Sequence, residues 1–343
     1  MIRPRKFATM DSMRFPPFAL ILLTGFLALP CAAFDPAEQD DSQAIVREFS
    51  QPVGPVAPAF QGAAFSPLQG ETISLIGGTM VVQMQDHGYL EATLQQSFPD
   101  KQIRVRNLAW PGDTVYLQQR PMFYYTEKGD PREGSVPDQR EKVEAGTLIL
   151  AFGKMESLDG LPALPGFKKT YDDLLAALGT RSKRIVMIEP IPFANTGPAA
   201  ALAAQRNVVL QQYTAAIHDL AENHGAIFVK MGAFPESAFT RNGLGLTATG
   251  QEEFATRFAQ ALGLKPSVAV DLISAILTKD TLWNQYHRPT NWAFLFGDRQ
   301  SVPSSRDHRD ANRRWFLEEI SQFPQLLEMA DETIHEAARN ATR

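Results

Sequence analysis

The sequence has very little cysteine: Cys31 is the only one among 343 residues. Cys31 lies inside an N-terminal segment that we expect to be removed, and a chain cleaved after Ala33 contains no cysteine at all. Disulfide bonds and thiol catalysis are then excluded, because both need a sulfhydryl group. The sequence also lacks the HExxH, CxxC, P-loop and GxGxxG patterns. We therefore expect no metal, redox or nucleotide cofactor.

An excess of positive charge is missing too. The net charge of −5 provides no electrostatic footprint for a phosphate backbone, which excludes nucleic acid as an expected partner. Long hydrophobic runs are almost absent, since the only one extends from Phe18 to Leu29. That run is shorter than the roughly 20 residues that a spanning helix needs. We expect no integral membrane segment once the N-terminus has been cleaved.

The N-terminal residues predict a secretory signal peptide over residues 1–33. Basic residues precede the apolar run, and small residues follow it at Ala32 and Ala33. Such a peptide implies export to the periplasm or the cell exterior. An uncleaved anchor is the first alternative, and lipidation of Cys31 is the second, although Pro30 is a poor neighbour for that processing.

The remaining chain divides by composition into three parts. Residues 34–69 are rich in Pro, Ala, Gln and Gly without a sustained period, which is typical of a linker. Residues 70–265 alternate short apolar runs with helical patterns. Residues 266–343 form an aromatic and helical C-terminal extension, which we expect to pack on the preceding domain and to offer a surface to a protein partner.

The alternation in residues 70–265 predicts an α/β fold. We expect strands near Ile73–Ile76, Ile103–Leu108, Thr147–Gly153, Arg184–Ile188 and Ala226–Val229, and helices near Val81–Phe98, Gly166–Leu178, Ala199–Asn223 and from Thr247 onward. Strands separated by such helices pair in parallel with right-handed crossovers. The expected architecture is a flavodoxin-like three-layer sandwich around a central parallel sheet of about five strands.

Thr79 is the first candidate site residue. It follows the first predicted strand and the Gly77-Gly78 turn, and open α/β sheets bind ligands beyond the carboxyl ends of their strands. A simpler interpretation is that the two glycines only form the tight turn of a βα unit. In the same way, Gly112 fits an ordinary turn, and Met155 fits the core.

The order of four loops resembles the sequence blocks of the SGNH (GDSL-type) esterases and lipases. The resemblance covers residues 71–264 and rests on the segments Gly77–Met80, Asn107–Gly112, Gly153–Glu156 and Asn242–Thr247. It implies the SGNH-hydrolase fold. In that family a serine nucleophile is activated by a histidine and an aspartate, and a glycine amide and an asparagine side chain bind the oxyanion.

These family positions are mostly substituted here. The positions of the serine, glycine, asparagine, aspartate and histidine hold Thr79, Gly112, Met155, Asn242 and Gly245. A shift of one residue would put Arg241 in place of Asn242. A hydroxyl is a weak nucleophile without a base, and Gly245 has no side chain. Met155 cannot donate a hydrogen bond.

The substitutions predict a catalytically degenerate protein that binds an acylated or carbohydrate-type ligand or a protein partner. The alternative is an active ester hydrolase that uses Thr79 with a relocated base. Asp113, Glu156 and His287 are the side chains considered for that role. For the two carboxylates, solvation or pairing with arginine is the commoner outcome, and for His287 it is packing among aromatic residues.

Overall fold

The computed structural model describes residues 56, 58–60, 64–118, 145–180, 182–198, 200–267, 269–295, 299 and 301–342. These residues belong to one compact unit, Asp41–Arg343. The predicted signal peptide and the first half of the predicted linker lie outside them. Within the described part of the chain, no helix is long and apolar enough to cross a membrane.

The centre of the fold is a five-stranded sheet with the order β2-β1-β3-β4-β5. Its strands are β1 (Thr72–Gly77), β2 (Arg104–Asn107), β3 (Ala145–Ala151), β4 (Arg184–Ile188) and β5 (Ile227–Val229). All neighbouring strands pair in parallel, which confirms the predicted fold class. Because the strands are parallel, the loops that follow β1, β2, β3 and β4 leave from the same end of the sheet.

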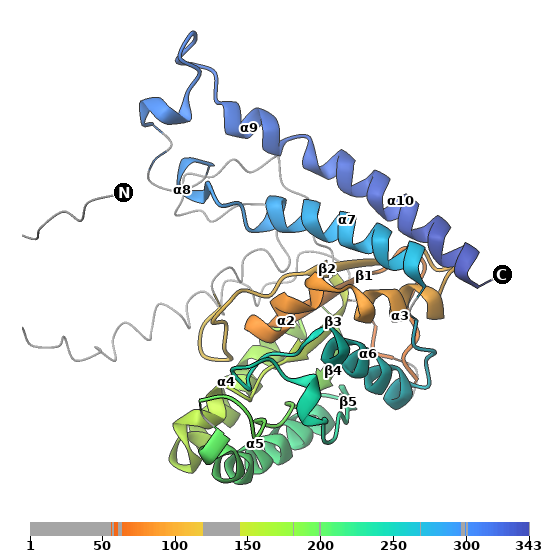
Figure 1. Cartoon of the computed structure of the whole chain (residues 1–343), viewed down its shortest axis with the longest axis vertical. Helices are drawn as coiled ribbons and strands as arrows, with labels where there is room; N and C mark the ends of the chain where they lie inside the picture. The colour runs from red at the N-terminus through yellow and green to blue at the C-terminus, as the bar shows by residue number, and fades with distance from the viewer. Residues whose placement is uncertain are drawn as a thin grey trace, which may run out of the picture. The chain divides into compact units, whose positions relative to one another are not determined.

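Helices cover both faces of the sheet (Figure 1). They are α2 (Thr79–Gln83), α3 (Tyr89–Ser97), α4 (Leu164–Leu178), α5 (Ala203–Asn223), α6 (Ala248–Leu262), α7 (Val270–His287), α8 (Trp292–Leu295), α9 (Trp315–Ile320) and α10 (Phe323–Ala341). Helices α4 and α5 pack on one face, and α2, α3 and α6 pack on the other. These are the three layers that the sequence predicts.

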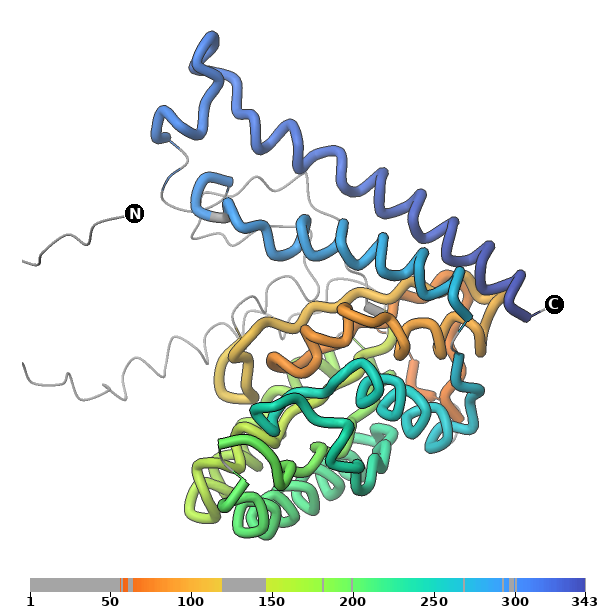
Figure 2. Tube along the Cα trace, in the orientation of Figure 1, coloured from red at the N-terminus to blue at the C-terminus, as the bar shows by residue number. Residues whose placement is uncertain are grey.

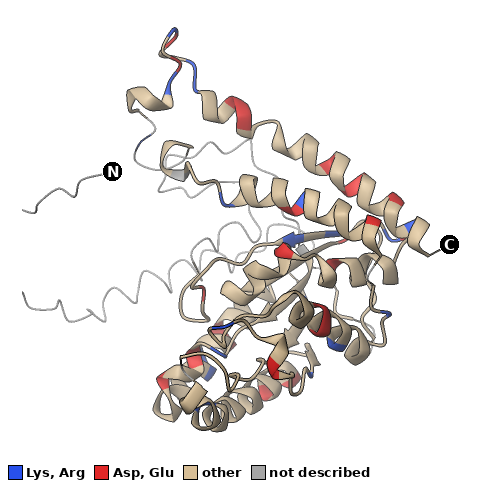
Figure 3. Ribbon diagram, viewed as in Figure 1, with Lys and Arg blue, Asp and Glu red and all other residues tan. Residues whose placement is uncertain are grey.

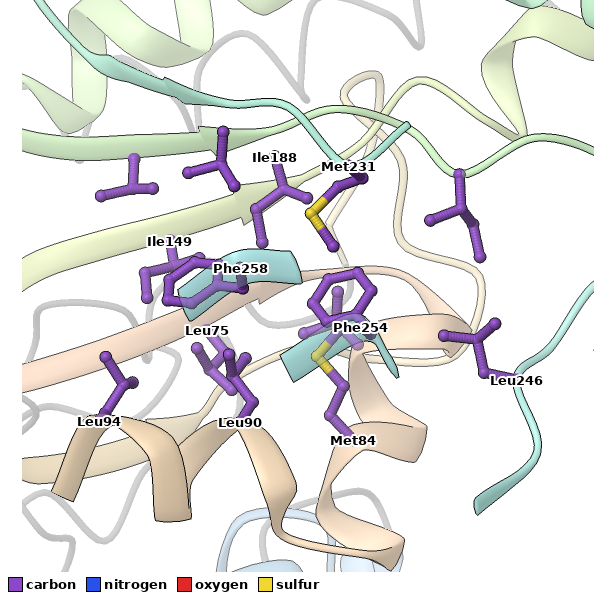
Figure 4. Packing of buried hydrophobic residues seen from close by; sticks show 14 of the residues in the cluster. Leu75, Met84, Leu90, Leu94, Ile149, Ile188, Met231, Leu246, Phe254 and Phe258 are labelled. Carbon is purple, nitrogen blue, oxygen red and sulfur yellow. The ribbon is translucent and has the colours of Figure 1, made fainter. Parts of the chain in front are cut away.

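Alternate residues of β3 enter the two hydrophobic layers. Leu148 and Leu150 join the cluster below α4 and α5, whereas Ile149 joins the cluster on the opposite face. Figure 4 shows that second cluster, with Phe254 and Phe258 of α6 packed near Ile149. A strand buried on both faces explains why the sequence of β3 is apolar at nearly every position.

The predicted helix from Val81 to Phe98 is wrong, because the chain forms two helices there. Helix α2 ends at Gln83, and α3 begins after Gly88, which has a left-handed φ of 66°. A Cβ atom at Gly88 would lie 2.9 Å from the Ile276 side chain, so the glycine also permits the close approach of α7. The apolar period continues across this break and hides it from a periodicity argument.

Helix α7 was not predicted as a helix. Its 18 residues place Lys279 and Asp280 among the buried positions together with Leu272 and Ile276. Charged residues on the buried side interrupt the apolar period from which a helix is recognised. The aromatic residues of the extension stand out in the sequence, but their helical spacing does not.

Helices α7 and α10 run side by side next to the edge strand β2 (Figure 2). The amide groups of Arg104 and Leu108 donate to Glu71 O and Leu75 O, so the backbone groups of the alternate residues Ile103, Val105 and Asn107 face away from β1. Side chains of the extension donate to these outward carbonyls: His335 Nε2 to Ile103 O at 2.9 Å, Lys279 Nζ to Val105 O at 3.2 Å and Trp283 Nε1 to Asn107 O at 2.7 Å. An edge strand whose acceptors are used in this way cannot pair with another chain.

Buried ion pairs join the extension to the domain, and Figure 3 shows charged residues of both signs where α7 passes β2. Arg106 of β2 donates to both oxygens of Asp331 in α10, at 3.0 and 2.5 Å. Lys279 Nζ lies 2.6 Å from Glu91 Oε2 of α3 and 2.6 Å from Asp280 Oδ1. Because these side chains are at most 7 % exposed, each charge depends on its partner.

The Lys279 cluster predicts a pH dependence of stability. Burial raises the pKa of Glu91 to about 7, and the ammonium of Lys279 opposes this shift only in part. Lys279 itself stays charged, because Asp280 alone can balance it while Glu91 holds a proton. The folded state then binds that proton more tightly than the unfolded state, so the contribution of Glu91 is present below about pH 4.5 and is lost as the pH rises through about 7.

We expect Glu91→Gln to flatten this dependence. Urea unfolding of both proteins at about pH 5 and about pH 8 should show wild-type stability falling relative to the variant, by on the order of 2–3 kcal/mol. An equal response of the two proteins to pH would contradict the assignment to Glu91.

Candidate functional site

Two glycines place Thr79 at the carboxyl end of β1. A Cβ atom at Gly77 would lie 2.7 Å from Ala151 O, and one at Gly78 would lie 2.8 Å from Asp113 O. Neither approach tolerates a side chain, so the glycines allow the loops after β2 and β3 to close on this turn. Thr79 follows as the first residue of α2, so Gly77 and Gly78 form the turn of a β1–α2 unit.

The Thr79 side chain is exposed and makes no hydrogen bond to any residue that the structure describes. A hydroxyl becomes a nucleophile when a base within hydrogen-bond distance accepts its proton. No described side chain is placed to do this for Thr79.

The loop after β2 carries Gly112 and Asp113. Gly112 is exposed with a φ of 89°, and a Cβ atom there would meet nothing within 4 Å, so its backbone conformation alone favours glycine. Asp113 is 4 % exposed. Its charge acts on Arg288, whose pKa burial lowers to about 10 against the opposing effects of Asp280, Asp113 and Asp86.

The loop after β3 contains Met155 and Glu156. Met155 is 50 % exposed and therefore not a core residue. Glu156 is buried, and its two oxygens accept hydrogen bonds from Val115 N at 2.9 Å and Gly153 N at 2.8 Å. Burial raises the pKa of Glu156, and these two bonds oppose the shift. Glu156 ties the loops after β2 and β3 together.

The loop before α6 reaches α2 one turn beyond Thr79. Gly245 is buried, and a Cβ atom there would lie 3.0 Å from Gln83 Oε1. Residues 79 and 83 share one face of a helix. Asn242 Oδ1 accepts hydrogen bonds from Thr240 Oγ1 at 2.6 Å and Leu244 N at 2.9 Å, so it shapes its own turn. Arg241 is exposed.

His287 is the last residue of α7 and packs among aromatic rings. Its ring stacks on Trp283 with centroids 5.0 Å apart and planes at 9°, and Trp110 lies on it at 6.0 Å. The side chain is 6 % exposed. This is the packing role considered for it from the sequence.

Lys154 is a site residue that sequence reasoning missed. Its Nζ donates to Pro192 O at 3.1 Å and Leu244 O at 3.2 Å, so it bridges the loops after β4 and before α6. Burial lowers the pKa of Lys154 to about 8. The only signal in the sequence is its position between Gly153 and Met155, in the block where Met155 takes the place of the family's asparagine.

The cavity next to α2 is small, and a possible group of metal ligands lies away from the loops described above. A cavity of about 10 Å³ behind α2 holds no more than a water molecule; it is lined by Met80, Gln83, Met84, Leu90, Leu246, Gln251 and Phe254. Among the described residues, the group able to offer three ligand atoms to a metal is His218, Asp219 and Glu222 on α5. These residues lie on the helix surface, and nothing marks them as a metal centre.

The loops that carry the candidate residues leave one end of a five-stranded parallel sheet in an α/β protein, which is the architecture that the resemblance to the SGNH esterases implies. Among solved structures, the chain is similar to an acetylxylan esterase from Geobacillus stearothermophilus, with 17 % identity, a TM-score of 0.42 and coverage of 58 % of this chain and 96 % of the other. A lipase/acylhydrolase from Enterococcus faecalis matches at 16 % identity and a TM-score of 0.41, covering 58 % and 100 %. Neither a family model nor a curated protein matches the sequence. At these identities the likeness concerns the fold alone.

Proposed function

We propose that this chain is an exported, non-hydrolytic protein on a hydrolase-like scaffold, which binds an acyl or carbohydrate-type ligand at the carboxyl end of its sheet. The observation that carries the proposal is the isolation of the Thr79 hydroxyl from every described base. Loss of a triad base alone costs on the order of 10⁶ in turnover in a serine protease.

The side chains considered as relocated bases are engaged elsewhere. Both oxygens of Glu156 accept hydrogen bonds from backbone amides, His287 stacks on Trp283, and Asp113 is buried. Recruiting Glu156 or His287 would break an interaction that holds the loops or the extension in place. This favours binding over hydrolysis.

The oxyanion side of the site is weak as well. Met155 has no hydrogen-bond donor, and a single side-chain donor of this kind contributes roughly 10²–10³ to turnover. Its exposed thioether instead adds apolar surface at this end of the sheet, which suits an acyl chain.

The test is hydrolysis of 4-nitrophenyl acetate together with labelling by a fluorophosphonate probe. We expect a rate close to the uncatalysed background and no labelling. Thr79→Ala should be indistinguishable from the wild type in both assays. Turnover above background that disappears in Thr79→Ala would instead identify the chain as an active ester hydrolase.

A further inference from the structure

Like Arg288, which donates only to neutral oxygens, Lys154 has no carboxylate partner among the described residues, unlike three more deeply buried cations of this domain. The side chains of Arg106, Arg184 and Lys279 each pair with a carboxylate at 2.5–2.8 Å. No carboxylate of the described residues lies within 4.0 Å of Lys154 Nζ, and the partners of this group are two carbonyl oxygens. A partly buried cation without an anion is costly. The ammonium group of Lys154 therefore favours binding of an anion that the described residues do not supply.

The geometry leaves one donor of Lys154 unused. An ammonium has three N–H groups, and two of them point to Pro192 O and Leu244 O. The third donates to no residue that the structure describes. The rings of Phe193 and Phe239 lie 5.1 and 5.5 Å from Nζ and restrict its position further.

Exposed aliphatic side chains occur next to Lys154 in the chain and at one of its hydrogen-bond partners. Met155, the next residue in the chain, is 50 % exposed, and Leu244, whose carbonyl binds Nζ, is 36 % exposed. A single charged donor beside exposed aliphatic side chains matches an amphiphilic ligand, which has one anionic head and one hydrocarbon chain. A neutral ester offers no charge to the ammonium.

We propose that Lys154 binds the carboxylate of an organic acid whose hydrocarbon chain lies on Met155 and Leu244. This inference rests on the proposed function and narrows it, because the bound species is the free acid and not an ester. The carboxylate accepts the third N–H of Lys154 and supplies the negative charge that the described residues do not.

The experiment is calorimetric titration of the purified protein with octanoate and, separately, with octan-1-ol at neutral pH. We expect octanoate to bind the wild type at least about ten-fold more tightly than octan-1-ol, since a hydrogen bond to a charged group contributes this much. Lys154→Met should weaken octanoate binding by a similar factor and leave octan-1-ol binding unchanged. Lys169→Met, on the exposed surface of α4, is the matched control and should bind octanoate as the wild type does.

Equal binding of octanoate and octan-1-ol by the wild type would overturn the inference, and so would the absence of octanoate binding. The comparison of these two probes does not depend on a variant, so it decides the matter even if Lys154→Met fails to fold. Unchanged octanoate binding in a folded Lys154→Met protein would also overturn it. Hydrolysis of 4-nitrophenyl octanoate by the wild type contradicts the proposed function, whereas failed binding without hydrolysis contradicts only this inference.

Discussion

Replacing Asp331 with alanine is expected to lower the free energy of unfolding by about 3–5 kcal/mol, a large part of the 5–15 kcal/mol typical of a domain. Asp331 accepts two hydrogen bonds from Arg106, whose side chain is 1 % exposed. Without this carboxylate, the buried guanidinium on the edge strand loses both of these charge-assisted hydrogen bonds. Equilibrium unfolding in urea measures the loss as a lower midpoint.

A matched control separates burial from charge. Asp173→Ala removes the same chemical group from the exposed pair with Lys169, where the side chains are 50 % and 72 % exposed. Exposed pairs contribute about 0–1 kcal/mol, so this variant should unfold close to the wild type. The double variant Arg106→Met/Asp331→Leu should recover most of the stability, because it removes both buried charges together. A loss below about 1 kcal/mol in Asp331→Ala would show that the pair does not secure the extension.

The regular part of the fold could be predicted from the sequence, because its signals are local. The apolar run Arg184–Ile188 coincides with β4, and Thr247 caps α6 by accepting a hydrogen bond from Gly250 N at 3.2 Å, as expected. Alternation of strands and helices was sufficient to indicate a parallel sheet with helices on both faces.

The role of the extension could not be predicted, because it depends on pairs that are far apart in the sequence. Lys279 pairs with Glu91 across 188 positions, and Arg106 pairs with Asp331 across 225. In the sequence these residues read as ordinary surface charges. Only the fold shows that α7 and α10 bury them against the edge strand.

The positions of the candidate residues follow from the strand order, but their chemical role stays a prediction. Thr79 at the start of α2 and Gly112 on the loop after β2 lie at the carboxyl end of the sheet, and the loop that carries Gly245 reaches α2. Lys154 was missed because its chemistry comes from two carbonyl groups on other loops, at Pro192 and Leu244. No residue pattern near position 154 indicates that Lys154 contacts those carbonyl groups.

Restoring the family residues is expected to raise hydrolysis well above the rate of the wild type. The combination of Thr79→Ser, Met155→Asn, Asn242→Asp and Gly245→His supplies a nucleophile, a donor and a base with its orienting carboxylate. We expect the combined variant to hydrolyse 4-nitrophenyl acetate at least about 10²-fold faster than the wild type, whereas each single change has no effect. Members of one catalytic unit act only together.

The structure adds a condition to this experiment. A side chain at position 245 starts 3.0 Å from Gln83 Oε1 and 3.3 Å from Thr240 Oγ1, so a histidine there needs room on α2. Gln83 is the end of a flexible side chain, and Gln83→Ala as a fifth change removes the obstacle without touching the backbone. If the five-fold variant keeps its circular dichroism spectrum and still shows no hydrolysis, then position 245 does not face Thr79. In that case the pairing of these loops with the family blocks is wrong, even though the sheet is parallel and five-stranded as predicted.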